Sequence, residues 1–393
     1  MVSGQDIKKA VRARGREIVG FLARVLQTPS VTGDEAALAG VIAGEIERMG
    51  LKPQIEEAEK GRPNVLAEWK GFPGPRFVFN GHMDVFPPTA GEQGKYGPWS
   101  GQAEGDWIYG RGASDMKSGL CGSIMAVRVL REMGLLPKGS VLLTCTCDEE
   151  VGGRLGVKHL LQKGLITGDF GLNMEPTDLK LLLSHSGIYR ARFTFEGKAA
   201  SSSKPGDGVD ALEKSIRAVQ ALYELGGRIK ERSVPGWGSP TLSVTTFHAG
   251  TATNVLADRS TFSIDRRLVP GESHEAVEAE ILDVLEMQKN RDPDFRYIRE
   301  IISDRPALDV PPDSGIVKVI EKVYEDLQGK PVEKMTARWG SDAANIMKAT
   351  GMPMPILGPG RGEEAATANE KVSIENYLAA VEIYALTAAR MLA

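Results

Sequence analysis

The sequence predicts an α/β protein in which a ferredoxin-like α+β domain is inserted into a larger domain with a central mixed sheet. Strand-like runs alternate with helical patterns up to residue 187, which is typical of a sheet covered by helices on both faces. From residue 188 the order changes to β-α-β-β-α-β, a complete ferredoxin-like unit. We therefore expect the larger domain to comprise residues 1–187 and 305–393, and the inserted domain residues 188–304.

The first part of the larger domain is predicted element by element from periodicity and turn residues. Helical patterns cover 6–27 and 34–49 and precede two β-rich runs, "NVLAEW" and "RFVFNG". A loop rich in glycine and proline follows from Pro87 to Gly112. Beyond this loop, the sequence predicts a helix in "SDMKSGLCGSIMAVRVLREMG", a strand in "SVLLTCTC", a helix near 154–163 and a strand in "DFGLNME".

The inserted domain begins with "IYRARFTFEG", which alternates apolar and polar residues as a half-exposed strand does, and we expect this strand at a sheet edge. A helix over about 208–231, the strand pair "PTLSVTTFHAG" and "STFSIDRRLV", and a further helix and strand complete the unit. Because an exposed edge must be covered or paired, we expect two chains to pair through this domain. The last part of the larger domain has helical patterns in "GIVKVIEKVYEDL", "GSDAANIMKATG" and "NYLAAVEIYALTAARML".

Composition and charge exclude several classes of partner. Of the 393 residues, 41% are hydrophobic and 25% are charged, and the net charge of −4 is spread without long runs of one sign. This pattern offers no site for nucleic acid or an anionic membrane, so we expect a small-molecule partner. The 3 cysteines lie in apolar segments and make no disulfide framework, which favours a reducing cytoplasm. No segment approaches the roughly 20 apolar residues that a membrane-spanning helix needs.

Three acidic residues stand side by side where a buried strand ends. Asp148, Glu149 and Glu150 follow "SVLLTCTC", and their mutual repulsion requires a counter-charge. His82 and Asp84 follow the strand "RFVFNG", and their i, i+2 spacing turns both side chains to one face. Taken singly, an acidic triplet is typical of a solvated turn, and a His-x-Asp sequence is typical of a hydrogen-bonded pair.

Two further carboxylates occupy comparable positions. Asp115 lies at the predicted N-cap of a helix, a position that an aspartate often takes only to cap the helix, and Glu175 lies at the end of "DFGLNME". Ligand sites form where strands end at one edge of an α/β sheet. A histidine and several carboxylates from four separate segments therefore predict a divalent metal ion as the counter-charge of the acidic triplet.

The motifs "GHMDVFP", "GRGASDMKSG", "DEEVGG" and "MEPTD" closely resemble the motif series of one metallopeptidase family. This family includes acetylornithine deacetylase, succinyl-diaminopimelate desuccinylase, aminoacylase-1 and carboxypeptidase G. The resemblance extends through "GTATNV", "DRRLVPGE", "GSDA" and "GPG", over nearly the whole chain. It implies a zinc-peptidase-like catalytic domain and an inserted lid that also forms a homodimer. The implied reaction is hydrolysis of an amide bond in an N-acyl amino acid or a small peptide with a free carboxylate.

The resemblance also implies roles for the residues of the metal site. His82, Asp115 and Glu175 would bind one metal ion, and Asp115 would bridge to a second ion held by Glu150. Asp84 would orient His82 from behind, a contact that fixes the tautomer and basicity of an imidazole ligand.

The neighbours of these ligands also receive roles from the resemblance. Glu149 would act as the general base toward water, while Asp148 would be structural. The family has a cis peptide bond after the bridging aspartate, which predicts a cis bond between Asp115 and Met116.

Substrate-binding residues are implied in the lid, where the chain also departs from the family pattern. Arg267 in "DRRLVPG" and Asn254 in "TATNVLAD" match positions that contact substrate, and an arginine suits a carboxylate because its planar fork makes two parallel hydrogen bonds. Ser201 stands where the family has a histidine that stabilises the developing oxyanion in the partner subunit's site. Ala366 in "AATANE" stands where the family has its last metal-ligating histidine.

The replacement at Ala366 weakens the second metal position but leaves the first with one nitrogen and two carboxylate ligands. We expect one firmly bound divalent ion, zinc or alternatively manganese, and a second ion that is weak or absent. Glu363, Glu364 or Thr367 could reach the second position in place of the missing histidine.

Three functions remain open from the sequence. The first is a metal-dependent amidohydrolase with an altered substrate preference. The second is an enzyme of another class that uses the metal and Glu149 for proton transfer, ring opening or deamination. The third is an inactive relic that binds a ligand, and it is disfavoured because a relic has no physical reason to keep the metal-site residues together.

Overall fold

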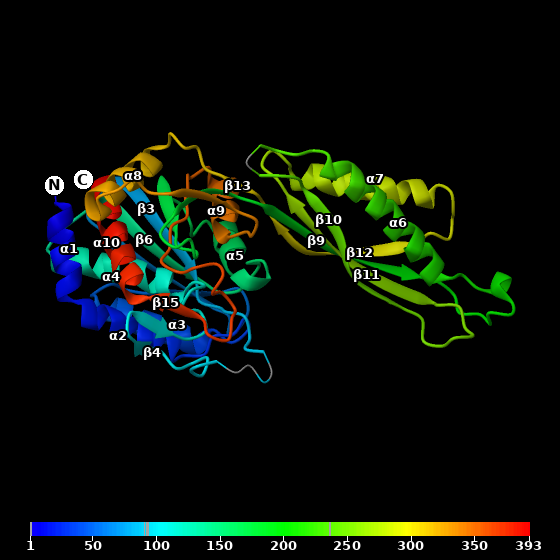
Figure 1. The fold of residues 1–393 in the computed structure, drawn as a ribbon, viewed down its shortest axis with the longest axis horizontal. Coiled ribbons are helices and arrows are strands. Elements are labelled where there is room, and N and C mark those ends of the chain that lie inside the picture. The colour runs from blue at the N-terminus through cyan, green and yellow to red at the C-terminus, as the bar shows by residue number, and fades with distance from the viewer. Residues whose placement is uncertain (1, 90, 92–93, 236) are drawn as a thin grey trace. The chain divides into compact units, whose positions relative to one another are not determined.

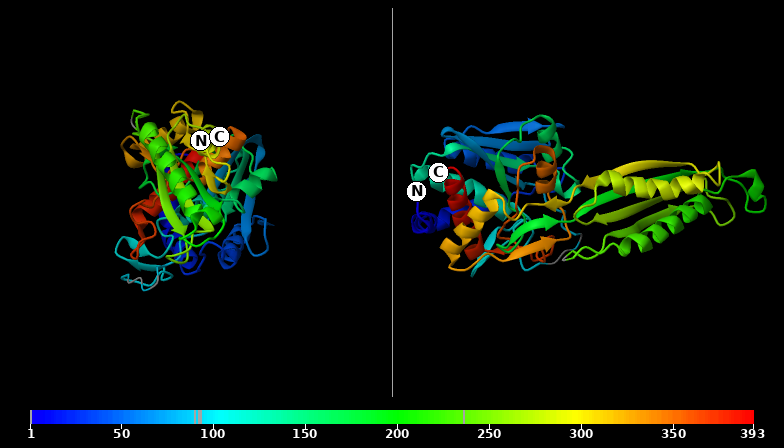
Figure 2. Two further views of the ribbon diagram at one scale, coloured as in Figure 1. Left: turned by 90° about the vertical axis from the view of Figure 1, so that its right-hand side faces the viewer. Right: turned by 90° about the horizontal axis from the view of Figure 1, so that it is seen from above.

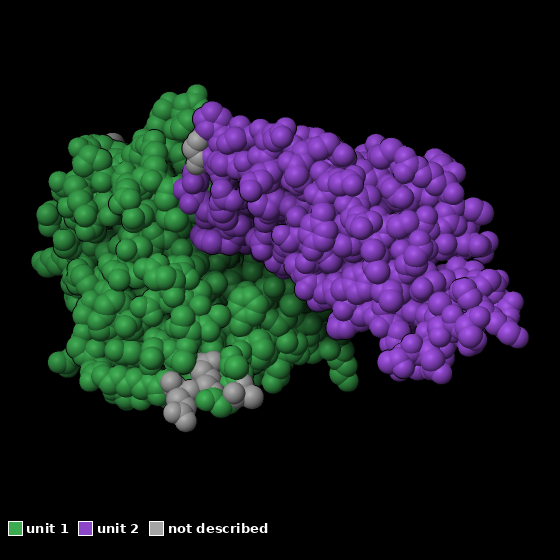
Figure 3. All heavy atoms as spheres, turned by 45° about the vertical axis from the view of Figure 1, so that its right-hand side comes forward, with its two compact units in different colours: residues 1–184, 310–335, 341–393 green, residues 185–309, 336–340 purple. Residues whose placement is uncertain are grey.

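The computed structural model describes residues 2–89, 91, 94–235 and 237–393. The chain divides into two compact units (Figure 3): unit 1 comprises residues 1–184, 310–335 and 341–393, and unit 2 comprises residues 185–309 and 336–340. The predicted domain boundaries fall inside two strands of unit 2, β9 (Gly187–Glu196) and β12 (Tyr297–Arg305). No local sequence pattern indicates that 336–340 belongs to unit 2, where the amide of Ser186 donates a hydrogen bond to the carbonyl of Ala337.

The central sheet of unit 1 has the order β1–β2–β6–β3–β7 and is mixed, as the sequence predicts. Strand β3 (Phe72–His82) runs parallel to both β6 (Lys138–Thr146) and β7 (Phe170–Asn173). Strand β2 (Pro63–Lys70) is antiparallel to β6, and β1 (Gln54–Glu57) is antiparallel to β2. Because β3, β6 and β7 are parallel, the segments that follow them emerge at the same edge of the sheet.

Helices pack against this sheet (Figure 1). Helix α4 contacts β3 and β6 and is buried over most of its length, which is typical of a core helix, while α9 contacts β3 and β7.

The pattern predicted as one helix over 6–27 forms two helices that meet at Arg14. Figure 2 shows the two ends of the chain near each other in unit 1. The helices of this unit are α1 (Gly4–Ala13), α2 (Gly15–Leu26), α3 (Ala36–Arg48), α4 (Lys117–Glu132), α5 (Val157–Gln162), α8 (Gly315–Gln328), α9 (Asp342–Thr350) and α10 (Ile374–Met391), with a 3-10 helix, η1 (Glu149–Val151).

A short sheet of β4, β5 and β15 accompanies the central sheet of unit 1. Strands β4 (Gln102–Glu104) and β5 (Trp107–Tyr109) form within the segment predicted as a loop and pair with β15 (Lys371–Ser373). This pairing places the residues just after β5 beside the residues just before β15. The short strands β8 (Leu181–His185), β13 (Leu308–Asp309) and β14 (Lys334–Ala337) lie where the chain passes from one unit to the other.

Unit 2 has the predicted order β-α-β-β-α-β. Its antiparallel sheet has the order β10–β11–β9–β12, and α6 and α7 lie on one face of it (Figure 1). Phenylalanine side chains from the strands and apolar side chains from both helices form its core. The remaining elements of this unit are α6 (Ala211–Lys230), β10 (Thr241–Ala249), β11 (Arg259–Leu268), α7 (His274–Lys289) and the 3-10 helix η2 (Pro205–Asp207).

The predicted edge position of "IYRARFTFEG" is wrong. This segment forms β9, which lies between β11 and β12, and the edges of the sheet are β10 and β12. Along β9 the buried residues Tyr189, Ala191 and Phe193 alternate with more exposed ones, because helices cover only one face of the sheet. Alternation of apolar and polar residues therefore indicates that only one face of the sheet is covered. It does not indicate whether the strand lies at the edge or the centre of the sheet.

Among the helices that the structure describes, none is long and apolar enough to cross a membrane. The cysteines Cys121, Cys145 and Cys147 are buried and form no disulfide.

Candidate metal centre

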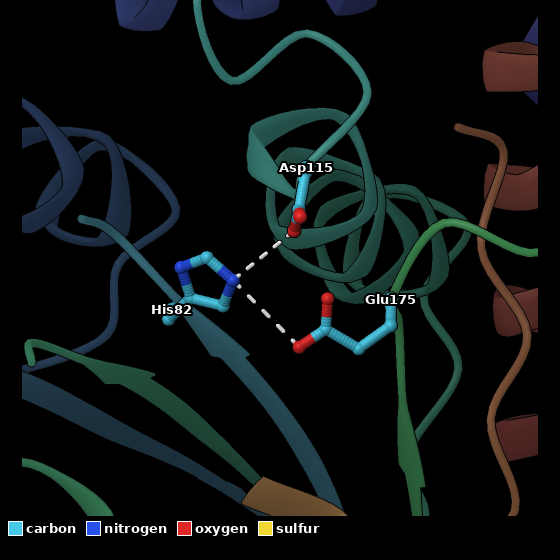
Figure 4. A group of neighbouring side chains, drawn as sticks. All are labelled: His82, Asp115 and Glu175. Carbon is cyan, nitrogen blue, oxygen red and sulfur yellow. Dashed lines mark ion pairs between the residues drawn. The ribbon is translucent and has the colours of Figure 1, made fainter. Parts of the chain in front are cut away.

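Three of the predicted ligands converge at the edge of the central sheet where β3 and β7 end (Figure 4). His82 is the last residue of β3, Glu175 follows β7, and Asp115 precedes α4, so that the three side chains point toward one another. Nε2 of His82 lies 3.3 Å from Oδ1 of Asp115 and 3.7 Å from Oε1 of Glu175. The prediction that Asp115 is the N-cap of α4 is wrong, because the N-cap is Met116 and Asp115 lies one residue before it. The peptide bond between Asp115 and Met116 is cis, as the resemblance predicts.

The chemistry of this group fits a divalent cation. The three ligand atoms lie within 4.8 Å of one another, and in the described part of the chain none of them has a hydrogen-bond partner although all are buried. Burial and the charge of Asp115 raise the pKa of Glu175. Burial disfavours a charged imidazole and so lowers the pKa of His82. The carboxylates of Glu175 and Asp115 favour the charged form more strongly, and the pKa of His82 is raised as a result. A cation would neutralise these carboxylates and give each buried atom a partner, and one nitrogen with two oxygens suits zinc or manganese.

Asp84 connects the His82 segment to the acidic triplet. Nδ1 of His82 donates a hydrogen bond to the backbone carbonyl of Asp84 at 2.8 Å and lies 3.5 Å from its Oδ1. The Asp84 carboxylate accepts hydrogen bonds from the amides of Glu149 at 3.0 Å and Glu150 at 3.2 Å, and from the hydroxyl of Thr32 at 2.9 Å. These contacts support the orienting role predicted for Asp84, since they leave Nε2 of His82 facing the other ligands.

Asp148 has a counter-charge of its own. Its Oδ1 accepts a hydrogen bond from Arg62 at 3.0 Å, and its Oδ2 accepts one from the amide of Leu155 at 3.1 Å. These contacts anchor the loop after β6, which agrees with the structural role predicted for this residue.

Glu149 and Glu150 differ in their surroundings. Glu149 is buried, and its Oε2 lies 4.0 Å from Nε2 of His82. Glu150 does not belong to the group formed by His82, Asp115 and Glu175. Burial and the charge of Asp115 raise the pKa of Glu150, so its carboxylate also lies in a site with excess negative charge.

Comparison with known proteins decides the family. The model of the peptidase family M20/M25/M40 matches residues 78–390. The chain belongs to this family. Its members are metallo-hydrolases that act on N-acyl amino acids or peptides, which confirms the resemblance seen in the motifs.

Individual relatives agree with this assignment over most of their length. Protein YgeY of Escherichia coli (strain K12) is 28% identical over 382 residues, which cover 94% of this chain and 93% of the relative. Acetylornithine deacetylase of Aliivibrio fischeri (strain MJ11) is 28% identical over 364 residues, which cover 90% of this chain and 93% of the relative. The M20 family metallo-carboxypeptidase Sso-CP2 of Sulfolobus solfataricus superposes with a TM-score of 0.80 at 18% identity, covering 95% of this chain and 98% of that chain. This superposition confirms the fold class.

The loop around Ala366, where the M20 resemblance expects a histidine, brings no replacement ligand to the group in the described structure. The carboxylate of Glu364 lies 3.7 Å from the ammonium of Lys371, and the hydroxyl of Thr367 donates to the carbonyl of Glu364 at 2.8 Å. Neither residue joins the ligand group, and neither does the exposed Glu363. The suggestion that one of these side chains reaches the second metal position, beside Glu150, stays a prediction.

The predicted substrate residues of the M20 lid fall into two places within unit 2. Ser201 and Asn254 lie together, since the amide of Ser202 donates to the carbonyl of Asn254 at 3.0 Å. Arg267 lies near the C-terminal end of β11, about 25 Å along the strand, at the usual rise per residue, from Arg259, where the chain enters β11 after Asn254. Its guanidinium donates to Oδ1 of Asp265 at 2.7 Å, which fixes its orientation.

Two glycines near the M20 site have a role that the sequence did not reveal. A Cβ atom at Gly358 would lie 2.3 Å from the carbonyl oxygen of Glu175, and one at Gly360 would lie 2.1 Å from the carbonyl oxygen of Ser114. Only glycine permits such close approach of one backbone to another. The motif "GPG" is the sequence signal, but it does not show that this loop backs the segments of Glu175 and Asp115.

Proposed function

We propose that this protein is a metal-dependent hydrolase that cleaves an amide bond in an N-acyl amino acid or a small peptide-like substrate with a free carboxylate. One observation carries the proposal: three buried ligand atoms without hydrogen-bond partners, one nitrogen and two carboxylate oxygens, converge beside the buried carboxylate of Glu149. Within the M20 family, this arrangement suits hydrolysis better than simple ligand binding, because a binding protein has no need of a base at this position.

Glu149 would carry the proton transfers. The bound ion would supply Lewis-acid polarisation of the scissile carbonyl. With its Oε2 4.0 Å from Nε2 of His82, Glu149 would take a proton from a water molecule as this water attacks the carbonyl, and would then return the proton to the leaving nitrogen. A general base placed in this way typically contributes about 10²–10⁴ in rate.

We further propose that one divalent ion is firmly bound by His82, Asp115 and Glu175. Zinc is the favoured metal, and manganese suits the same ligands. A second ion would have only Asp115 and Glu150 from the chain, since Ala366 has no donor atom, and we propose that this ion is weak or absent. Two carboxylates completed by water lack the chelate advantage of a third protein ligand.

Arg267, Asn254 and Ser201 are the proposed substrate contacts. The separation of about 25 Å along β11 is too large for Arg267 and Ser201 of one chain to contact the same small substrate. This separation supports a homodimer formed through the lid, in which Arg267 of one chain and Ser201 with Asn254 of the other serve one site. The neutral hydroxyl of Ser201 would give weaker oxyanion stabilisation than a charged imidazole.

The proposal is tested by measuring the metal content of the purified protein and then screening N-acyl amino acids and dipeptides with the metal restored. We expect one tightly bound divalent ion per chain and metal-dependent release of an amino acid. The Glu149→Gln variant should keep its metal and lose at least about 100-fold in turnover. Metal-dependent chemistry on another substrate class without amide hydrolysis would favour the non-peptidase alternative, and a metal-free, inactive protein would favour the ligand-binding relic.

A further inference from the structure

Glu370 is a buried carboxylate next to the candidate metal centre that has no role in the proposed reaction. It lies just before β15 and is 3% exposed. Its Oε1 accepts hydrogen bonds from the amides of Ser114 at 3.0 Å and Asp115 at 3.1 Å. Its Oε2 accepts a hydrogen bond from Nη1 of Arg111 at 3.1 Å. All these contacts therefore end on the segment that carries Asp115.

This segment needs such an anchor because it has no regular secondary structure of its own. It connects β5 to α4 without a strand or helix that would hold its amides. A charged acceptor that binds two consecutive amides fixes the orientation of both peptide planes. The direction of the Asp115 side chain follows from that orientation.

A second pair of hydrogen bonds holds the same segment at the side chain of Ser114. The hydroxyl of Ser114 donates to the carbonyl of Arg361 at 2.6 Å and accepts from the amide of Arg361 at 2.6 Å. The segment is thus held at its amides by Glu370 and at a side chain by the loop after Gly360.

Glu370 does not act as a metal ligand in this geometry. Both of its oxygens accept hydrogen bonds from N–H groups, and it does not belong to the group of His82, Asp115 and Glu175. The buried guanidinium of Arg111 compensates its negative charge. Any effect of Glu370 on metal binding must therefore arise from its hold on the segment of Asp115.

We propose that Glu370 is a positioning residue that aims the Asp115 carboxylate at the metal ion by holding the amides of Ser114 and Asp115. The inference rests on the proposed metal-dependent function and extends it to a residue outside the ligand set. Partners behind a ligand typically change metal affinity by about 10- to 100-fold when they are removed.

The test is a chelator-competition titration with zinc on the Glu370→Gln variant, together with hydrogen exchange of the peptide spanning 111–117. We expect zinc affinity to fall at least about tenfold and exchange in this peptide to become faster. The matched control is Glu382→Gln, the same change at a buried glutamate whose Oε1 pairs with Arg12 at 2.6 Å, and it should leave zinc affinity unchanged. Affinity of Glu370→Gln within threefold of the parent, or an equal loss in Glu382→Gln, would overturn the inference.

A second variant keeps the test decisive if Glu370→Gln does not fold. Glu370→Asp keeps the charge beside Arg111 but withdraws the carboxylate by one methylene from the amides of Ser114 and Asp115, and the same thresholds apply to it. The parent protein separates the two levels of the proposal. A parent that binds no divalent ion contradicts the proposed function itself, whereas a parent that binds zinc no better than the variants contradicts only the role of Glu370.

Discussion

Replacing Asp84 by asparagine should destabilise the apo protein strongly, and the size of the effect can be worked out from its contacts. The carboxylate accepts three hydrogen bonds, from the amides of Glu149 and Glu150 and from the hydroxyl of Thr32. Asparagine offers one acceptor oxygen, so one buried amide loses its partner at a cost of about 1–3 kcal/mol. The two remaining hydrogen bonds go to a neutral acceptor instead of a charged one, which weakens each by about 1 kcal/mol. The free energy of unfolding should therefore fall by about 3–5 kcal/mol in total.

The assay is urea unfolding in the presence of a chelator, followed by circular dichroism, so that metal binding does not contribute to the free energy of unfolding. Thr32→Val is the matched control, because it removes only the hydroxyl bond to Asp84 and should cost about 1 kcal/mol. With metal present, Asp84→Asn should also weaken zinc binding about 10- to 100-fold. If the unfolding free energy of Asp84→Asn differs from the parent by no more than Thr32→Val does, the reasoning from these contacts is refuted.

Three further predictions address the ligand count, the lid and the glycine loop. Ala366→His should raise the number of tightly bound zinc ions per chain toward two, and two ions already present in the parent would contradict the ligand count. Burial and Arg305 lower the pKa of His185 to about 4, below its value of about 6.5 in the unfolded chain. The unfolded chain therefore takes up this proton first, and folding stability should fall by up to about 3 kcal/mol as the pH drops from 6.5 to 4. Urea unfolding across this range should show a flatter dependence for His185→Gln, and parallel curves would refute the assignment. Gly360→Ala should weaken zinc binding about tenfold in a chelator titration by pushing the loop off Ser114, whereas Gly40→Ala, where the added methyl meets nothing within 4 Å, should not.

The sequence predicts the parts of the fold and site that depend on local pattern. His82 ends a strand, and Glu149 and Glu175 follow strands, that a run of apolar residues identifies; parallel strands bring their ends to one edge. The order β-α-β-β-α-β in unit 2 follows in the same way from periodicity. These features can be predicted without knowing which distant segments of the chain are in contact.

The parts that the sequence does not predict depend on contacts between distant segments. The central position of β9 is one example, because its pairing partners lie about 60 to 120 residues away in the chain and leave no trace in the alternation of β9 itself. The approach of Gly360 to Ser114 and the hold of Glu370 on Asp115 are others, since each joins residues about 250 positions apart. A motif can mark such residues as unusual, but only the fold shows what they touch.

The backbone at Ala366 shows that a histidine at this position would require little change in the loop. Ala366 has a φ of 58°, a left-handed conformation that costs an ordinary residue roughly 1–2 kcal/mol. The next residue is anchored, since the carbonyl of Thr367 accepts hydrogen bonds from the amide of Glu370 at 3.3 Å and from Arg111 at 3.1 Å. Histidine adopts left-handed conformations more readily than most residues, so an imidazole could be carried here without refolding the loop. The difference between this chain and a member with the full ligand set is then one side chain, and the proposed loss of the second ion follows from the donor atom that alanine lacks.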